Sequence, residues 1–428
     1  MSSPYKIAAV HTLGCKVNFT ETSMIARQFQ ENGISLTSID NFADIYVVNT
    51  CSVTENANIK CNRLVRKIRR TNPDAFIVIT GCYAQLKSDE LSKDKNIDLV
   101  VGSDDKLRIP EIINNKVNSS IITSKIESVD SFNLSYSTGD RVRSFIKVQD
   151  GCDYNCTFCT IPLARGKSRS SSINEVIDLV NSLESKGCKE IVLSGINLGD
   201  FGNGTDQNCY KLLKELESST SIPRIRISSI EPNLISDNMI NLISSSDRFM
   251  PHLHIPLQSG SDRILKLMKR KYNSRFYSNK INKIKSMIPN IAIGVDVIVG
   301  FPTETDNDFE ETYKLLSELE VSYLHVFTYS ERENTIGLEI PSKVPQEIRN
   351  KRSKRLRALS DYLKSQFIIK NMSVNHTILV EGIDEKELHG YTENYIKVRV
   401  DNDDMKINDL VHVQPIQESY DSIKGKIL

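Results

Sequence analysis

The sequence predicts an α/β protein of three parts, and three observations lead to this fold class. β-type runs alternate with helical stretches over the first two parts, which is typical of parallel sheets with right-handed crossovers. The last part changes to short alternating runs, such as residues 395–400, separated by turn residues. The length of 428 residues allows two or three domains with buried cores. We therefore expect an N-terminal parallel-sheet α/β domain at 1–115, a linker at 116–140, a partial barrel of six βα units at 141–370 and a small β domain at 371–428.

The first part contains three β-type runs that each end in a cysteine. The runs are residues 5–12 before Cys15, 45–50 before Cys51 and 76–80 before Cys82. The carboxyl ends of parallel strands meet at one edge, where open α/β sheets hold ligands, and neighbouring strands lie about 4.8 Å apart. The pattern therefore predicts an iron–sulfur site with three protein ligands. The alternative is that these cysteines are small buried residues at strand ends.

The residues that follow two of these cysteines predict helices. Asn18 is placed to cap a helix, with Glu21 three residues on and Gly33 closing it. A second helix, from about 55 to 70, carries Cys61 at core spacing, so we interpret Cys61 as a packing residue. The opposite face of this helix is basic, which indicates a solvated surface or a contact with an RNA backbone. The basic residues are Lys60, Arg63, Arg66, Lys67, Arg69 and Arg70.

The second part contains six candidate strands, at 145–148, 191–194, 224–228, 253–255, 294–299 and 323–328. Three closely spaced cysteines, Cys152, Cys156 and Cys159, follow the first strand and so lie on the face where barrel enzymes carry their chemistry. Four cysteines fill every iron of a cubane iron–sulfur cluster, whereas three leave one iron open for an exogenous partner. The motif predicts a reactive metal centre, and the alternative is three unrelated buried thiols.

The composition indicates a soluble, cytoplasmic protein. Hydrophobic content of 39%, charged content of 25% and a net charge of +1 predict no overall attraction to polyanions. We expect no signal peptide and no membrane contact, because no basic segment precedes a long apolar run and the most apolar stretch, 291–301, is short. Nine cysteines without an export signal favour metal ligation in a reducing compartment.

The last fifth of the chain, residues 341–428, has two parts of opposite charge. Residues 341–370 carry nine Lys or Arg and two acidic residues, and this segment is expected to form a basic helix. Residues 371–428 carry six Lys or Arg and eleven Asp or Glu. An acidic tail is unexpected for a module that grips a polyanion.

Four phrases of the sequence resemble the methylthiotransferases, a family of radical S-adenosylmethionine (SAM) enzymes. Thr12-Leu-Gly-Cys-Lys-Val-Asn18, Val48-Asn-Thr-Cys-Ser-Val-Thr54 and Thr80-Gly-Cys-Tyr-Ala-Gln85 look like that family's auxiliary-cluster signatures, and the run from Cys152 to Gly166 looks like its SAM-cluster signature. The resemblance covers all three parts, and it implies a radical SAM partial barrel and a TRAM-like C-terminal domain. It also implies SAM and two 4Fe–4S clusters, a catalytic one on Cys152, Cys156 and Cys159 and an auxiliary one on Cys15, Cys51 and Cys82.

The resemblance further implies a reaction on tRNA. Reductive cleavage of SAM yields a 5′-deoxyadenosyl radical, and the auxiliary cluster holds the sulfur, which a first SAM methylates before a second activates C2 of an adenosine. The Lys-Val-Asn after Cys15 and Tyr391-Thr-Glu-Asn-Tyr395 look most like the branch that modifies N6-threonylcarbamoyladenosine at position 37, next to the anticodon. The isopentenyladenosine branch usually has a glutamine after that cysteine. A third branch modifies a ribosomal protein aspartate.

The partners implied by the resemblance are a tRNA anticodon stem-loop, an electron donor such as flavodoxin or ferredoxin, and a sulfur source. An alternative of a different class is an electron-transfer or binding protein in which both clusters serve redox alone. The spacing of the second cysteine trio argues against that alternative, since electron-transfer clusters usually have four cysteines.

Other residues near the strand ends are candidates for binding SAM or substrate, each with an ordinary role in packing or turns as the alternative. By resemblance, the SAM candidates are Phe158, Ser194, Gly195, Asn197, Glu231, Gln258, Ser259, Ile298 and Val299. The substrate-side candidates are Asn18 and Asn49, which would support the auxiliary cluster, and Arg165, Lys167 and Arg169, which would meet tRNA phosphates. His252 and His254 offer no metal spacing with a carboxylate, and we interpret them as structural.

Overall fold

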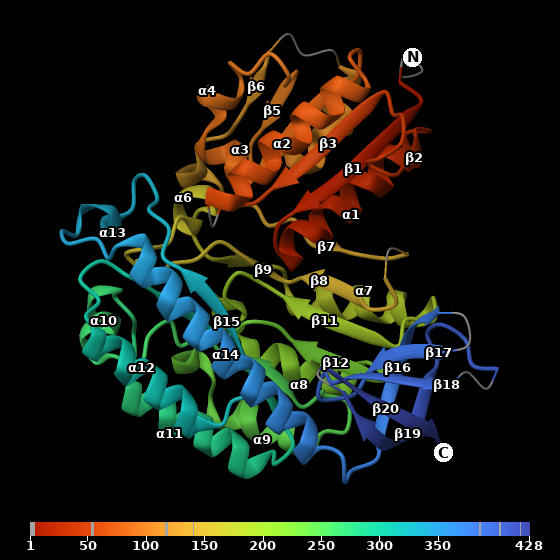
Figure 1. Ribbon diagram of the computed structural model, residues 1–428. Coiled ribbons are helices and arrows are strands. Elements are labelled where there is room, and N and C mark those ends of the chain that lie inside the picture. Colours follow the sequence, from red (N-terminus) through yellow and green to blue (C-terminus); the bar gives the residue numbers. More distant parts are fainter. Residues whose placement is uncertain are drawn as a thin grey trace.

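The computed structural model describes residues 5–52, 55–115, 119–139, 141–384, 387–401, 404–419 and 421–428. Figure 1 shows an N-terminal sheet with its helices above a central barrel, and a small C-terminal barrel beside the central one. In the described part of the chain, no helix is both long and apolar enough to cross a membrane.

The N-terminal sheet has six parallel strands in the order β2-β1-β3-β4-β5-β6. Its strands are β1 (Ile7–Leu13), β2 (Ser35–Thr37), β3 (Ile45–Thr50), β4 (Phe76–Gly81), β5 (Leu99–Val101) and β6 (Ile121–Ile122). Its helices are α1 (Lys16–Glu31), α2 (Glu55–Thr71), α3 (Cys82–Leu86), α4 (Ser88–Leu91) and α5 (Ile109–Asn114). One face packs against α2 and the other against α1 and α5, so central strand β3 is buried along its whole length. The predicted parallel sheet is confirmed.

Two local predictions in this part are tested by the helices. Cys61 is fully buried in the core beneath α2, as a packing residue is expected to be. The predicted helix cap is wrong: α1 begins at Lys16 with Cys15 as its N-cap, and Asn18 lies inside the helix. Gly33 does follow the end of α1 with a φ of +76°, a left-handed conformation that favours glycine.

The expected linker contributes an edge strand to each of two sheets. β6 extends the N-terminal sheet, and β7 (Ser135–Tyr136) pairs antiparallel with the first barrel strand. Both strands lie in a segment whose composition shows no strand pattern. The expected linker therefore also takes part in the two sheets through its backbone hydrogen bonds.

The central part is a partial barrel of six parallel strands, as predicted. They are β8 (Ser144–Lys147), β11 (Glu190–Ser194), β12 (Arg224–Ile227), β13 (His252–His254), β14 (Ala292–Val299) and β15 (Tyr323–Thr328). Isolated bridges from Ile225 to Phe249 and from Ser229 to His254 join the two halves of the sheet. Short strands β9 (Gln149–Asp150) and β10 (Arg169–Ser170) pair at the carboxyl end of β8.

Helices surround the barrel, and Figure 1 shows α11, α12 and α14 along its outer side. They are α6 (Ile161–Arg165), α7 (Ile173–Ser185), α8 (Cys209–Ser219), α9 (Asp237–Ser245), α10 (Asp262–Leu267), α11 (Ser274–Met287), α12 (Asp306–Leu319), α13 (Ile336–Glu339) and α14 (Gln346–Lys370). The predicted basic helix is α14, which begins five residues after the expected start because Pro345 is its N-cap.

The C-terminal part is a closed barrel in the order β16-β17-β18-β20-β19. Its strands are β16 (His376–Asp384), β17 (Glu387–Tyr391), β18 (Lys397–Asp401), β19 (Leu410–Glu418) and β20 (Ser422–Ile427), around a core of Ile, Leu and Val side chains. The expectation of a small β domain is confirmed.

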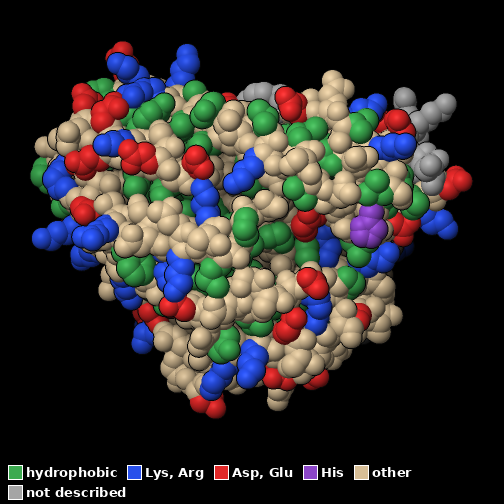
Figure 2. Space-filling view, turned by 90° about the horizontal axis from the view of Figure 1, so that it is seen from below, with side chains coloured by type: hydrophobic (Ala, Val, Ile, Leu, Met, Phe, Trp, Pro, Cys, Tyr) green, Lys and Arg blue, Asp and Glu red, His purple; other side chains and the backbone are tan. Residues whose placement is uncertain are grey.

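Figure 2 shows the whole molecule from below, with acidic and basic side chains interspersed on the face seen there.

A buried cluster of one carboxylate and three arginines attaches this small barrel to the central one. Arg226 and Arg224 each place Nε 2.7 Å from a carboxylate oxygen of Glu190, and Arg143 lies 3.8 Å from it. Arg226 also donates to the backbone carbonyls of Thr392 and Glu393, both at 2.8 Å. Burial lowers the pKa of Arg224 to about 10 although Glu190 acts to raise it, so Glu190 is the counter-ion of buried Arg224 and Arg226.

The Glu190→Gln variant is expected to lower the free energy of unfolding by about 3–5 kcal/mol, because it leaves buried arginines without their counter-ion. Urea denaturation followed by circular dichroism measures this change. Glu318→Gln removes the same charge from an exposed helix position and is the matched control. Equal stability of the two variants would contradict the structural role of Glu190.

Candidate active site

The loop with three cysteines lies at the carboxyl end of the first barrel strand, as predicted. It connects β9 to α6, and Gly151 at its start has a φ of +70°. A Cβ atom at Gly151 would lie 1.9 Å from the carbonyl oxygen of Lys167, so no larger residue fits this turn. The turn brings Cys152, Cys156 and Cys159 into one compact loop, in which the Cys159 amide donates to the Cys156 carbonyl at 3.1 Å.

Each sulfur of this loop accepts a hydrogen bond from an N–H group. The donors are the Tyr154 amide to Cys152 at 3.5 Å, the Ile161 amide to Cys159 at 3.4 Å and Arg270 Nη1 to Cys156 at 3.0 Å. As free thiols, Cys152 and Cys159 have their pKa raised by burial to about 12, so binding a metal must displace their protons. Three sulfurs with N–H donors suit the thiolate ligands of an iron–sulfur cluster, whose potential depends on such bonds.

Arg270 is a site residue that sequence reasoning missed. It joins Cys156 to Glu231, with which it forms a buried ion pair. Glu231 was expected to contact SAM, and the structure places its carboxylate against Arg270. No spacing in the sequence marks Arg270, since it follows α10 in a run of basic residues.

The structure brings most of the other SAM candidates to the same end of the barrel. Phe158 and Ile298 pack around a small cluster formed by Ile264, Met268, Phe301 and Tyr329. Gln258 has a φ of +70° and bridges to Val297, next to Ile298 and the buried Val299. Ser194 and Gly195 line a large cavity, Ser259 is buried, and the Asn197 amide donates to Gln149 at 2.9 Å.

The N-terminal cysteines stand at the ends of three adjacent strands. Register pairs Leu13 with Thr50 and Thr50 with Gly81, so the chain leaves the sheet at one edge just before Cys15, Cys51 and Cys82. Asn18 and Asn49 tie this edge together. Asn18 Nδ2 donates to the Thr50 carbonyl at 2.9 Å, and Asn49 Nδ2 donates to the Asn18 carbonyl at 3.0 Å.

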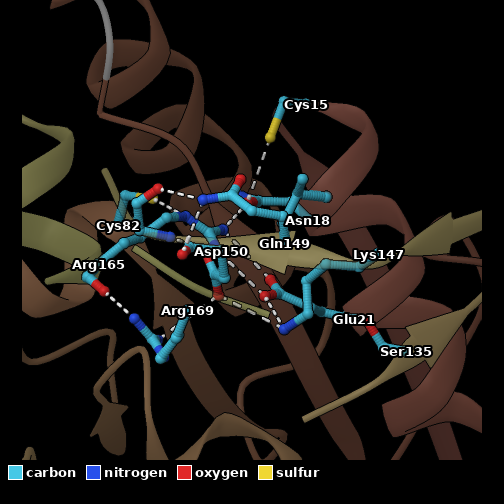
Figure 3. A network of polar contacts seen from close by, with 12 residues as sticks. Cys15, Asn18, Glu21, Cys82, Ser135, Lys147, Gln149, Asp150, Arg165 and Arg169 are labelled. Atoms are coloured by element: carbon cyan, nitrogen blue, oxygen red, sulfur yellow. Dashed lines mark hydrogen bonds and ion pairs between the residues drawn. The ribbon is translucent and has the colours of Figure 1, made fainter. Parts of the chain in front are cut away.

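Arg165, at the end of α6, reaches from the loop of the second trio to Cys82 of the first, and Figure 3 shows it in a polar network. Its Nε donates to Cys82 Sγ at 3.2 Å, and Nη1 donates to Glu21 at 3.0 Å and to Asp150 at 2.9 Å. Nη2 donates to Asn18 and, at 3.3 Å, to Glu21. These five bonds match the five donors of a guanidinium group.

The prediction that Arg165 meets tRNA phosphates is therefore wrong, because its side chain is 1% exposed and all its donors are used inside the protein. The same expectation fails for Arg169, whose guanidinium donates to the backbone carbonyls of Ser131 and Arg165. Lys167 is exposed, as expected of a residue that meets a solvent-borne partner.

The network around Arg165 holds an excess of positive charge. Lys106, Lys147, Arg165 and Arg169 lie within 3.6 Å of carboxylate oxygens of Glu21 or Asp150, so four cations face two carboxylates. Burial acts to raise the pKa of Glu21, but Arg165 and the two lysines outweigh it and hold the pKa well below the ordinary 4.5. The excess positive charge beside Cys82 fits a site that holds anionic thiolates.

A cavity of about 1080 Å³ lies between the three parts of the chain. Cys15 and Lys16 from the N-terminal edge, Ile161 and Gly195 from the barrel mouth, and Tyr395 from the small barrel all line it. A smaller cavity of about 230 Å³ is lined by Ser52, Tyr83 and Thr160. Ser52 and Tyr83 directly follow cysteines of the first trio, and Thr160 directly follows a cysteine of the second. Cys15 therefore borders the large cavity, and neighbours of cysteines from both trios line the small one.

The interpretation of the histidines needs one correction. His254 Nε2 lies 3.0 Å from Asp296 Oδ1, and ligand atoms of His254, Asp296 and His325 all lie within 4.8 Å of one another. Strands β13, β14 and β15 bring together a group that sequence spacing does not reveal. His252 bonds to Tyr323 at 2.8 Å and stacks on Tyr395, which agrees with a structural role.

A partial (βα)6 barrel with three cysteines in the loop after its first strand defines the class of radical SAM enzymes. In agreement, residues 146–316 match the Radical SAM superfamily and residues 7–102 match the uncharacterized protein family UPF0004. The fold is similar to that of the radical SAM methyltransferase TsrM from Kitasatospora setae, with a TM-score of 0.57, 13% identity, and coverage of 78% of this chain and 77% of that chain.

Two full-length relatives define the family more closely. The chain is 39% identical to the threonylcarbamoyladenosine tRNA methylthiotransferase MtaB of Bacillus subtilis, over 98% of this chain and 96% of that protein. It is 31% identical to the tRNA-2-methylthio-N6-dimethylallyladenosine synthase of Staphylococcus epidermidis, over 98% of this chain and 84% of that protein. The chain therefore belongs to the methylthiotransferase family of radical SAM enzymes. Membership implies SAM and a 4Fe–4S cluster as cofactors.

The Arg165→Gln variant is expected to lose about 3–5 kcal/mol of unfolding free energy at pH 7, because Glu21 and Asp150 lose a buried partner. Both carboxyls have pKa values held below their ordinary 4.5 and 3.8, so the stability that they contribute is present above those values and lost as the pH falls below them. The difference between wild type and variant should therefore shrink below about pH 4.5. Urea denaturation across pH 7 to 3 measures it.

Arg66→Gln, which removes an exposed arginine from α2, is the control and should change stability little at any pH. A constant difference between wild type and Arg165→Gln down to pH 3 would contradict the proposed charge coupling.

Proposed function

We propose that this enzyme adds a methylthio group to C2 of N6-threonylcarbamoyladenosine at position 37 of tRNA, next to the anticodon. The observation that carries the proposal is that residues next to cysteines of both trios line one small cavity, and that Arg165, which follows Cys159 in α6, bonds to Cys82. The relatives of 36–39% identity that carry the name threonylcarbamoyladenosine tRNA methylthiotransferase support this substrate over dimethylallyladenosine, whose enzymes are 31% identical.

In this proposal each part of the chain has its own task. Residues 1–115 hold an auxiliary 4Fe–4S cluster on Cys15, Cys51 and Cys82, residues 141–370 hold the SAM cluster on Cys152, Cys156 and Cys159, and residues 371–428 form a TRAM-like wall of the substrate cavity. When bound, the clusters and SAM supply the radical chemistry and the sulfur that is transferred. The chain itself neutralises the thiolates, through the Arg165 network on one side and Arg270 on the other.

Several polar groups at the barrel mouth are available to hold SAM. Asn197 Oδ1 is buried and accepts no hydrogen bond from the described residues, so it is free to accept one from a ligand. Ser194, Gly195 and Gln258 lie at the same end of the barrel, with Ser259 and the backbone of Ile298 and Val299 beside them. We propose that these groups orient SAM over the Cys152 loop while Phe158 packs near its adenine.

The tRNA substrate is a polyanion and requires a basic surface, and α2 provides one close to Cys51. Lys60, Arg63, Arg66 and Arg70 are exposed there and form no ion pair with another described residue. Lys167 adds an exposed cation after the SAM-cluster loop. We propose that these side chains contact tRNA phosphates.

The other partners follow from the chemistry. We propose that flavodoxin or ferredoxin supplies electrons and that a separate sulfur source reloads the auxiliary cluster. The reaction is proposed to occur in the cytoplasm, where tRNA is found.

Cysteine variants separate the two cluster sites. Cys15→Ala is expected to lose the iron of one cluster and all methylthiolation, yet to release 5′-deoxyadenosine from SAM when given a reductant. Cys152→Ala is expected to release none. Cys61→Ala removes a buried packing thiol and should keep the full iron content. Iron analysis and chromatography of anaerobically purified protein make these measurements, and full iron in Cys15→Ala would refute the auxiliary site.

The substrate is tested by mass spectrometry of tRNA nucleosides from cells that lack the gene. We expect the methylthio form of N6-threonylcarbamoyladenosine to disappear and its unmethylthiolated precursor to accumulate. Loss of the isopentenyladenosine derivative instead would assign the other tRNA branch. Unchanged methylthioadenosines would favour a ribosomal protein aspartate as the target, and purified protein that releases no 5′-deoxyadenosine would favour an electron carrier.

A further inference from the structure

Lys16 lies in the wall of the large cavity, where burial, together with Arg143 and Arg226, lowers its pKa and Tyr395 acts to raise it. It is the first residue of α1, directly after Cys15, and its side chain borders the cavity. Within the described part of the chain, the side chain of Lys16 makes no hydrogen bond and no ion pair. The neighbouring cations differ in this respect, because Arg226 is paired with Glu190, and Arg143 with Glu381 at 2.6 Å.

The opposite wall near Lys16 comes from the small barrel. Tyr395 stacks on His252 and on Tyr391, with ring centroids 4.7 and 4.8 Å apart. Its φ of +68° is unusual for a tyrosine and is held by the surrounding contacts. Arg143 and Arg226 lie over its ring, at 5.2 and 5.1 Å from the centroid. The residues after Cys15 and the segment 391–395, far apart in sequence, thus meet at one cavity.

The electrostatic potential at this wall is positive. Burial acts to raise the pKa of Tyr395, yet Arg143, Lys16 and Arg226 together lower it below the ordinary value of 10.0. Two carboxylates also border the cavity, and Asp296 is occupied by its hydrogen bond to His254, while Asp421 lies on the exposed side. The wall formed by Lys16 and Tyr395 is therefore suited to an anion.

The proposed substrate carries an anion at the matching place. A threonylcarbamoyl group joins threonine to N6 through its amino nitrogen and leaves the carboxylate free, whereas a dimethylallyl group has no charge. In adenine, C2 and the carbon that bears N6 flank the same ring nitrogen. A residue that holds the N6 substituent should then lie close to the cluster that delivers sulfur to C2, and Lys16 is adjacent to Cys15.

We propose that Lys16, backed by Tyr395, forms a subsite that binds the carboxylate of the threonylcarbamoyl group and sets the preference for this substrate. The inference rests on the proposed function and deepens it. A charge-assisted bond of this kind accounts for about a 10- to 100-fold difference in affinity.

The test compares anticodon stem-loop RNAs that carry N6-threonylcarbamoyladenosine, its threonine methyl ester, or N6-dimethylallyladenosine. Dissociation constants from fluorescence anisotropy and KM values from methylthiolation assays are measured for wild type, Lys16→Gln, Lys16→Arg and the control Lys314→Gln. Lys314 is an exposed lysine on α12, on the outside of the barrel. Gln is chosen for position 16 because it removes the charge and retains a polar side chain.

Wild type and Lys314→Gln should bind the carboxylate RNA about 10- to 100-fold more tightly than the ester. Lys16→Gln should lose this difference by weakening only the carboxylate RNA, and Lys16→Arg should restore most of it. Iron content of each variant separates this effect from loss of the auxiliary cluster. If Lys16→Gln retains the wild-type ratio of carboxylate to ester, the subsite is refuted. If wild type methylthiolates none of the threonylcarbamoyl RNA, the proposed function itself fails.

Discussion

The buried guanidinium of Arg165 is the interaction on which the arrangement of this enzyme depends. It ends the short helix that follows Cys159, and it reaches across the boundary between sheets to Cys82, Glu21 and Asn18. Burying a guanidinium group is costly unless every donor is satisfied, and here all five are. The two cysteine trios are therefore fixed relative to each other by a contact that tolerates little displacement.

The charge around Arg165 also explains why this boundary is polar. A core of apolar side chains would join two sheets with less desolvation cost, since buried ion pairs often contribute little net stability. Four cations against two carboxylates leave a surplus that only an additional anion balances. In the proposed function, the Cys82 thiolate next to Arg165 would supply part of that negative charge when it holds metal, and the network would then couple metal binding to the docking of the two parts.

The sequence was sufficient for the three strands that end in cysteines and for the six barrel strands, because these follow from local periodicity and from the rule that parallel strands end at one edge, but not for the short strands β2, β5, β6 and β7. It was not sufficient for Arg165, which stands 144 residues from Glu21 and in a run that looks like an exposed basic turn. The sequence pattern predicted Asn18 as a helix cap for a similar reason. Asparagine side chains cap helices and also form tertiary hydrogen bonds, and the sequence alone does not distinguish these two roles. Arg270 carried no local signal at all.

The C-terminal barrel also shows how tertiary contacts change an interpretation based on composition. Its acidic composition argues against a module that holds RNA by charge, and the structure gives it another use. Arg224 and Arg226 hold the backbone at residues 392–393 from the barrel side, which fixes the neighbouring Tyr395 in its positive φ at the cavity. The small barrel thus forms one wall of the cavity, and Lys16, which we propose binds the anion of the substrate, comes from the first turn of α1 in the N-terminal part.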